Sequence, residues 1–309
     1  MFARTHHSPN EGEHIAATGR ARRSPLLAIA ILFLAASCAP QTPPTPVPPS
    51  ATPLPPTATS VPMAATVNGE GIPAEEYQAQ VAQYKSAQTA LGKTVTEEDA
   101  SKAVLEDLIA QVLLAQGAKA AGFVLSDADL KSRLDALTTE VGGADKLAAW
   151  ESAHGYTKDS FPIALKRAAE AAYMRDKIVS AVPKTADQVH VQQILLYNEG
   201  DAQAILNQIQ GGADFDTLAA QVDPKTRGEL NWFPKGYLLE PKVEEAAFSL
   251  QVGQVSDIIQ TQSGFDIIRV LARDPQHPLS PDAYLALQEI ALKDWVAKQR
   301  AAATVVLAP

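Results

Sequence analysis

The sequence predicts an α+β protein in which a mainly helical region is followed by a small α+β domain. Apolar residues recur at helical spacing between about Pro73 and Val182. From Gln188 to Val270, strand-like and helix-like segments alternate instead, which is typical of a small α+β domain. Alanine is abundant and aromatic residues make up only 6% of the chain, so helices are favoured over an all-β sandwich.

The overall composition excludes several functional classes. A chain of 309 residues is long enough for two domains. Its net charge of -9, with no basic stripe, argues against nucleic-acid binding. Cys38 is the single cysteine, so neither an internal disulfide nor a cysteine-rich metal site can form. His154, His190 and His277 lie far apart without ligand spacing, and we therefore expect no metal and no cofactor.

Residues 1–37 have the pattern of an export signal. Arg20, Arg22 and Arg23 precede an apolar run at 25–36, which is too short to span a bilayer as a helix. Small residues then lead into Cys38, and this junction resembles the lipobox of bacterial lipoproteins, with Ala35 where that motif usually has leucine. The resemblance implies lipidation of Cys38. An ordinary signal-peptidase site is the alternative, and the arginine pair also fits a twin-arginine signal.

Residues 38–63 predict a tether behind the lipidated cysteine. The stretch from Pro40 to Pro62 is rich in Pro and Thr and has few large apolar residues, so it cannot form a core. Such sequences adopt extended, polyproline-like conformations of about 3 Å per residue. A stiff segment of this kind would hold a domain away from the membrane; the alternative is an ordinary disordered linker.

Residues 64–186 predict a helical domain that opens with a short strand. The strand ends in a turn at Asn68-Gly69, and a helix follows from about Pro73. We expect further helices at 103–121, after a weak cap at Ser126, at 144–154 and at 158–182. The phrases VNGEGIPAEEYQAQ, LIAQVLLAQGAKAAGFVLSDADL and GYTKDSFPIALKRAAEAAYMRDKI, in this order, resemble the N-terminal chaperone domain of the SurA and PrsA foldases.

Residues 187–275 resemble the parvulin family of peptidyl-prolyl isomerases. The segments that carry the resemblance are QILL in the opening strand, ADFDTLAAQ in a helix, RGELNWFPKG in the central loop and VEEAAFSLQVGQVSDIIQTQSGFDIIRV at the end. The resemblance implies a small α+β fold and prolyl isomerase activity without a cofactor.

The same resemblance locates a candidate site. Parvulins usually have one histidine in the opening strand and another after the Ser-Gly of the last strand; Gln193 and Asp266 stand there, and Asp223 lies where the family has a cysteine or aspartate. His190 does not replace the first histidine, because three residues along a strand reverse the side-chain direction. The resemblance further implies a proline pocket, for which the alternative is an ordinary core. Its members are Leu238, Val243, Phe265 and Phe233.

Residues 276–309 predict an amphipathic helix from Pro281 to Ala303. The phrase LKDWVAKQRAAATVVL resembles the C-terminal helix and strand that return to the chaperone domain in SurA-like proteins. This implies a discontinuous helical domain with the parvulin-like domain inserted. The alternative is a free amphipathic helix.

Together these features predict an extracytoplasmic, lipid-anchored folding helper that faces the periplasm or cell wall. Its partners would be unfolded or proline-containing exported polypeptides, and the membrane through the anchor. Because both histidine positions are changed, the isomerase site looks degenerate, and weak or absent catalysis is expected. The alternatives are an active prolyl isomerase and a non-catalytic envelope scaffold.

Overall fold

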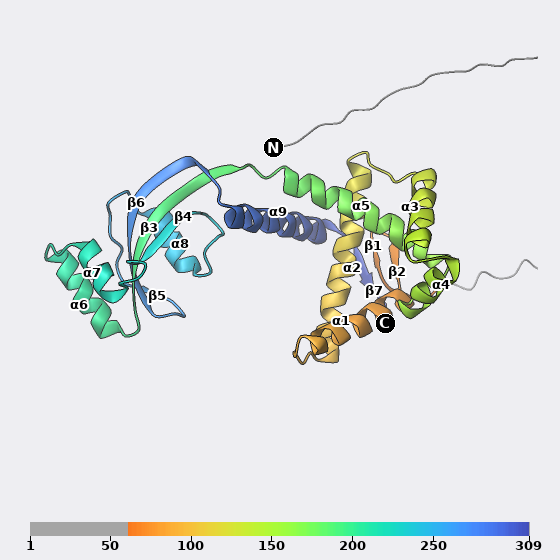
Figure 1. Cartoon of the computed structure of the whole chain (residues 1–309), viewed down its shortest axis with the longest axis horizontal. Coiled ribbons are helices and arrows are strands. Elements are labelled where there is room, and N and C mark those ends of the chain that lie inside the picture. The colour runs from red at the N-terminus through yellow and green to blue at the C-terminus, as the bar shows by residue number, and fades with distance from the viewer. Residues whose placement is uncertain (1–60, 309) are drawn as a thin grey trace, which may run out of the picture. The chain divides into compact units, whose positions relative to one another are not determined.

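The computed structural model describes residues 61–308 (Figure 1). The predicted signal peptide, the predicted lipidation site at Cys38 and most of the predicted tether lie outside the described residues. Among residues 61–308, no helix combines the length and the apolar character that a membrane span requires.

The helical part opens with a β-hairpin and continues through a series of helices. The hairpin consists of β1 (Met63–Val67) and β2 (Glu70–Pro73), joined by a turn in which Asn68 and Gly69 both have positive φ. The helices are α1 (Ala74–Ala90), α2 (Glu97–Ala120), α3 (Asp127–Glu140), α4 (Ala144–Ala153) and α5 (Ser160–Ser180).

Short polar side chains determine where two of these helices begin. The Ser126 hydroxyl accepts a hydrogen bond from the N–H of Asp129 at 3.1 Å, so the predicted cap of α3 is confirmed. Thr96 does the same for the N–H of Asp99 at the start of α2. For this reason α2 begins before the expected residue 103: its first turn is polar and carries no apolar periodicity, but it is capped.

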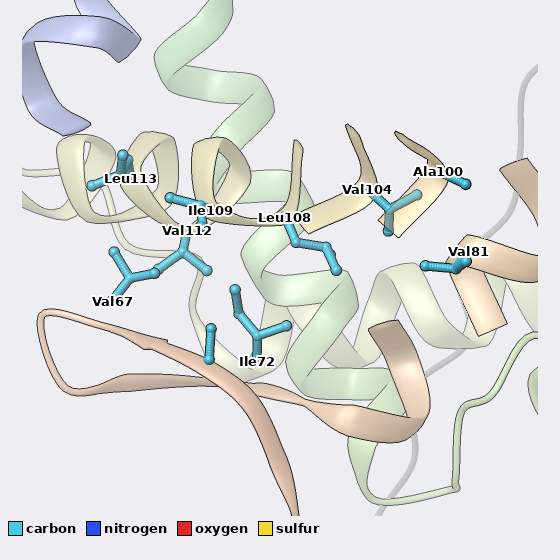
Figure 2. Packing of buried hydrophobic residues seen from close by; sticks show 10 residues of the cluster. Val67, Ile72, Val81, Ala100, Val104, Leu108, Ile109, Val112 and Leu113 are labelled. Carbon is cyan, nitrogen blue, oxygen red and sulfur yellow. The ribbon is translucent and has the colours of Figure 1, made fainter. Parts of the chain in front are cut away.

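The core of the helical part lies between the hairpin and α2. Figure 2 shows Leu108 and Val112 pointing from α2 toward Ile72 and Val67 on the hairpin. All four side chains are fully buried. The residues of this cluster are Ala65, Val67, Ile72, Val81, Ala100, Val104, Leu108, Ile109, Val112 and Leu113.

The C-terminal segment packs on the helical part. Strand β7 (Val305–Leu307) pairs antiparallel with β1, which gives a sheet in the order β2-β1-β7. Helix α9 (Pro281–Ala302) places Trp295 against Leu114 and Ala171. The packing is close, because a Cβ atom on Gly117 would lie 2.6 Å from the Trp295 ring. The predicted completion of the helical domain by the C-terminal helix and strand is confirmed.

The α+β part is built on a four-stranded antiparallel sheet in the order β4-β3-β6-β5. The strands are β3 (Thr185–Leu196), β4 (Glu229–Pro234), β5 (Ile259–Gln260) and β6 (Phe265–Pro278), and the helices are α6 (Glu199–Gln210), α7 (Phe215–Val222) and α8 (Pro241–Ser249). Strands β3 and β6 run past the predicted domain boundaries at 186 and 275, which themselves stay a prediction.

Side chains of the two long strands alternate between two small cores. Val189, Val191, Ile268 and Val270 pack with Phe233 and with residues of α8. On the other face, Ile194 and Ile267 pack with residues of α6 and α7 (Figure 1). A sheet with helices on both faces and a separate helical part confirms the predicted α+β fold class.

Candidate functional site

The neighbouring strands β3 and β6 bring two polar side chains together. In the antiparallel register Leu195 pairs with Asp266 and Gln193 with Ile268, so Gln193 and Asp266 are diagonal neighbours on one face of the sheet. The Nε2 group of Gln193 donates a hydrogen bond to Oδ1 of Asp266 at 2.6 Å. The hydroxyl of Thr261 donates to Oδ2 of Asp266 at 2.9 Å. Both carboxylate oxygens therefore have a donor.

The buried position of Asp266 changes its acidity. Only 1% of the residue is exposed. Burial raises the pKa of the Asp266 carboxyl above its ordinary value, the hydrogen bond from Thr261 lowers it, and the negative charge of Glu240 raises it further. The net direction is upward, so Asp266 takes up a proton more readily than an exposed aspartate.

A cavity of about 460 Å³ opens above this pair. Its walls are mostly apolar and come from β3, β4 and the loop before α8. Its lining also includes Gln193, Glu240, Ser263 and Asp266, and the Ser263 hydroxyl donates to Oε1 of Glu240 at 2.8 Å. The apolar lining residues are Leu195, Leu230, Tyr237, Leu238, Leu239 and Val243.

The loop that carries Leu238 is fixed by a carboxylate on α8. Oε1 of Glu244 accepts a hydrogen bond from the N–H of Gly236 at 2.7 Å. Oε2 accepts from the N–H groups of Tyr237 at 3.0 Å and Leu238 at 3.1 Å. One side chain thus satisfies three consecutive backbone donors, and the wall of the cavity has a defined shape without belonging to a regular element.

A second cavity, of about 560 Å³, lies in the helical part between α1, α2 and α4. Its lining includes Tyr84, Trp150, His154 and Tyr156. The Trp150 ring stacks on His154 with 4.0 Å between ring centroids, and 41% of Trp150 is exposed. Half-exposed aromatic rings beside Gln83 thus form a partly apolar surface with an amide group next to it.

Two family models match separate parts of the chain. Residues 178–272 match the PPIC-type PPIASE domain, and residues 57–140 match the SurA-like N-terminal domain. The chain thus combines a region that matches a SurA-like N-terminal domain with a region that matches a parvulin-type domain, and in this it is similar to the SurA/PrsA-like foldases.

Curated relatives and solved structures are similar to this chain over shares of their length that differ widely. A protein named foldase protein PrsA from Caldanaerobacter subterraneus is 28% identical over 66% of this chain and 72% of its own. A foldase protein PrsA from Oceanobacillus iheyensis is 39% identical over 27% of this chain and 29% of its own. Among solved structures, peptidylprolyl isomerase PrsA from Bacillus cereus is 22% identical, covers 67% of this chain and 82% of its own, and has a TM-score of 0.41.

Within the parvulin domain, four of the predicted site residues line one cavity. They are Gln193, Asp266, Leu238 and Val243. Asp223 lines an adjoining cavity of about 390 Å³, which shares Gln193, Leu195 and Leu230 with the first. There the carboxylate of Asp223 accepts hydrogen bonds from Thr226 and from the N–H of Lys225, and the side-chain bond from Thr226 holds the pKa of Asp223 below its ordinary value.

The structure places the two predicted phenylalanines elsewhere. Phe233 is fully buried in the core under α8, where its ring packs against Phe248 at 6.2 Å. Phe265 neighbours Asp266 in sequence and so points to the opposite face of β6; it is not among the residues that line the cavity. The predicted lipidation site, Cys38, lies outside the described residues.

His190 lies apart from the cavity of the parvulin domain. Its Nε2 atom contacts the carboxylate of Glu229, and its ring stacks with Trp232 at 5.4 Å. Among the described residues, therefore, no histidine lines the parvulin cavity.

Several residues of the parvulin cavity were not predicted from the sequence. Leu230 and Leu195 form part of its wall, and Glu244 fixes the loop opposite them. A signal for Leu195 existed in the strand pattern, because Leu195 is two residues from Gln193 and therefore shares its face. Glu244 had no such signal, since its function depends on the path of an irregular loop.

Proposed function

We propose that this protein is an extracytoplasmic folding helper that binds unfolded exported polypeptides and places their prolines in the parvulin cavity. The coarse function is supported by the matches to the SurA-like and parvulin domains and by relatives named foldase. The observation that carries the finer proposal is a well-formed apolar cavity whose polar side holds Gln193 and Asp266 in place of the two usual histidines.

Prolyl isomerisation has undemanding chemistry. The barrier of about 18–20 kcal/mol arises from loss of amide resonance in the twisted state, so no nucleophile, metal or redox group is required. A site needs only to bind the twisted amide better than the planar one. The leucine walls can hold the pyrrolidine ring away from water, which favours the less polar, twisted amide.

The polar side of the cavity differs from that of an efficient parvulin. In this proposal Gln193 and Asp266 replace the two usual histidines and satisfy each other's hydrogen-bonding groups on this face of the sheet. The pair contributes little to the catalytic rate. The site is therefore degenerate: it retains proline binding and has weak or no isomerase activity.

The aromatic cavity of the SurA-like domain is proposed as the second surface for clients. Trp150 and Tyr156 offer apolar area with few rotatable bonds, and Gln83 offers an amide that can bind a peptide backbone. Two such surfaces on one chain would bind an extended polypeptide more tightly than either alone.

The test is an aggregation assay and an isomerase assay on the same sample of the full chain. We expect stoichiometric amounts to slow aggregation of an unfolded client, and Trp150→Ala to weaken this effect while the exposed Leu285→Ala does not. We expect a cis–trans exchange rate on a proline peptide close to that of buffer. If aggregation were unaffected, the holdase function would be wrong.

An active isomerase is the second candidate, and the completeness of the apolar wall around Leu238 favours it. A clear exchange rate that disappears in Leu238→Ala would establish catalysis at this cavity and replace the degenerate-site proposal. A rate equal to buffer would rule out this candidate.

The anchor is proposed from the sequence around Cys38. Lipidation there would place the chain at the outer side of the cytoplasmic membrane, behind the Pro/Thr-rich segment. Mass spectrometry of the mature N-terminus decides the point: a diacylglyceryl-modified Cys38 is expected, whereas an unmodified residue at a different cleavage site would contradict it.

A further inference from the structure

The charged residues that line the parvulin cavity all have the same sign. Glu240 and Asp266 belong to the cavity itself, and Asp223 and Glu229 line the adjoining one. Among the described residues, no lysine or arginine lines either cavity. A peptide whose proline lies between the leucine walls therefore meets charged lining residues of negative sign only, within the part of the chain that the structure describes.

Glu240 is the carboxylate best placed to act on a ligand. Asp266 lies at the buried end, with both oxygens occupied by Gln193 and Thr261. Glu240 is instead half-buried, lines the cavity and lies directly before α8. The hydroxyl of Ser263 binds only its Oε1 atom, at 2.8 Å, which orients the group and leaves Oε2 for a partner.

The nearest lysine on α8 is directed elsewhere. Lys242 donates from Nζ to the backbone carbonyl of Gln260 at 2.9 Å and is not a lining residue. Lys235 lies over the ring of Phe248, beside a different cavity. In the part of the chain that the structure describes, neither lysine forms an ion pair with Glu240, so these two cations do not neutralise its negative charge.

We propose that Glu240 makes the parvulin cavity selective by charge: it favours prolines flanked by lysine or arginine and disfavours prolines flanked by aspartate, glutamate or a phosphorylated residue. The inference rests on the proposed function, because it assumes that the cavity binds proline segments. Residues next to a bound proline must extend toward solvent, and Ser263 is exposed and Glu240 half-buried, so these two lining residues are accessible to them. A basic residue there gains a partner, and an acidic one meets repulsion.

The size of the effect follows from Coulomb's law near a protein surface. Charges about 5–7 Å apart in a partly solvated environment change an affinity by roughly threefold to tenfold, and salt screens the effect. This is a moderate selectivity, suited to a protein that must bind many clients.

The experiment compares three short peptides that differ only beside a central proline: lysine on both sides, glutamine on both sides, and glutamate on both sides. Affinities for the full chain are measured by NMR from the methyl signals of Leu195, Leu230 and Leu238. We expect the order lysine, glutamine, glutamate, with roughly threefold to tenfold between the first and the last. Raising the salt concentration from about 0.05 to about 0.5 M should compress this range.

A matched pair of variants assigns the effect to one residue. Glu240→Gln keeps an oxygen for Ser263 and is expected to bring the three affinities together, while Glu240→Lys should reverse their order. Glu245→Gln, at an exposed position on the same helix, should leave the order unchanged.

Failure of the inference and failure of the proposed function are distinguishable. If all three peptides bind with equal affinity and salt has no effect, the charge selectivity is wrong while proline binding stands. If none of the peptides shifts the methyl signals of the cavity, both proposals are wrong. Because the salt series needs no variant, the test remains decisive if Glu240→Lys fails to fold.

Discussion

Glu244 holds Leu238 by its backbone: Oε2 of the carboxylate accepts a hydrogen bond from the Leu238 N–H at 3.1 Å. The same side chain also binds the N–H groups of Gly236 and Tyr237. A residue outside the cavity lining thus determines the position of a residue inside it. This relationship makes the shape of the proposed proline pocket depend on a single carboxylate.

Glu244→Ala should therefore loosen the cavity without removing any of its lining. Three backbone donors lose their acceptor, and we expect a loss of about 1–3 kcal/mol in the free energy of unfolding and a several-fold weaker affinity for a proline peptide. Glu244→Gln, which retains one acceptor oxygen, should be intermediate. Urea titration and peptide binding measure both effects. The control is Glu245→Ala; an equal loss there would show that the carboxylate of Glu244 has no special role.

Asp266 should make stability depend on pH. Burial raises its pKa above the ordinary 3.8, so the folded state binds the proton more tightly than the unfolded state does. The resulting stabilisation is complete below pH 3.8 and is lost as the pH rises through the raised pKa. The Asp266→Asn variant has no carboxyl to titrate at this position. Its free energy of unfolding, relative to that of the unmodified chain, should therefore increase as the pH rises through this window.

Urea titrations at a series of pH values test this, together with the carboxyl ¹³C shift of Asp266. A midpoint for Asp266 at or below 3.8 would contradict the prediction.

Asp223 is the opposite case, because the hydrogen bond from Thr226 lowers its pKa. Its contribution is present above pH 3.8 and is lost as the pH falls through the lowered pKa, so Asp223→Asn should lose stability at neutral pH.

Much of the fold could be predicted from the sequence because it depends on local signals. Ser126 caps α3 through its own side chain, and Gly122 follows α2 with a positive φ, as a helix end requires. The first turn of α2 cannot be predicted from apolar periodicity, because its residues are polar; only the capping side chain marks where the helix begins. The parvulin resemblance predicts Gln193 and Asp266 in one site, and in the structure their side chains are hydrogen-bonded and line the same cavity.

The contacts of the site could not be predicted, because they depend on long-range geometry. The Gln193–Asp266 hydrogen bond requires the register of β3 with β6, and that register shifts between His190 and Val191. The place of Leu230 depends similarly on the pairing of β4 with β3, which is irregular between Val191 and Gln192. Irregularities of this kind leave no mark in an alternating pattern.

Breaking a buried ion pair in the SurA-like domain should lower the free energy of unfolding far more than breaking an exposed one. Arg167 and Glu76 are 5% and 3% exposed and form a salt bridge between α5 and the first turn of α1. Glu76→Gln leaves a buried guanidinium without its counter-charge, and we expect a loss of about 3–5 kcal/mol in the free energy of unfolding. Lys131→Gln, which breaks the exposed pair with Asp135 on α3, should cost less than about 1 kcal/mol.

The double variant Glu76→Gln/Arg167→Met separates charge pairing from packing. Without either charge, the desolvation penalty disappears, so the double variant should be more stable than Glu76→Gln alone. Denaturant titration of the unmodified chain, the single variants Glu76→Gln and Arg167→Met, and the double variant gives the coupling energy between the two residues. Strictly additive losses would show that Arg167 and Glu76 do not depend on each other for burial.

Trp295 should stabilise the SurA-like domain specifically, although it follows the parvulin domain in the chain. The ring lies against Gly117 and contacts the cluster of Leu114 and Ala171, which joins α9 to α2 and α5. Trp295→Ala should cost about 2–3 kcal/mol, because loss of a large, partly buried aromatic side chain leaves a cavity. Hydrogen exchange should quicken in α2, α5 and β1 and stay unchanged in β3 and β6. Leu285→Ala, at a position 62% exposed on the same helix, is the control. Equal loss of protection in the parvulin sheet would mean that the C-terminal helix does not belong to the helical domain alone.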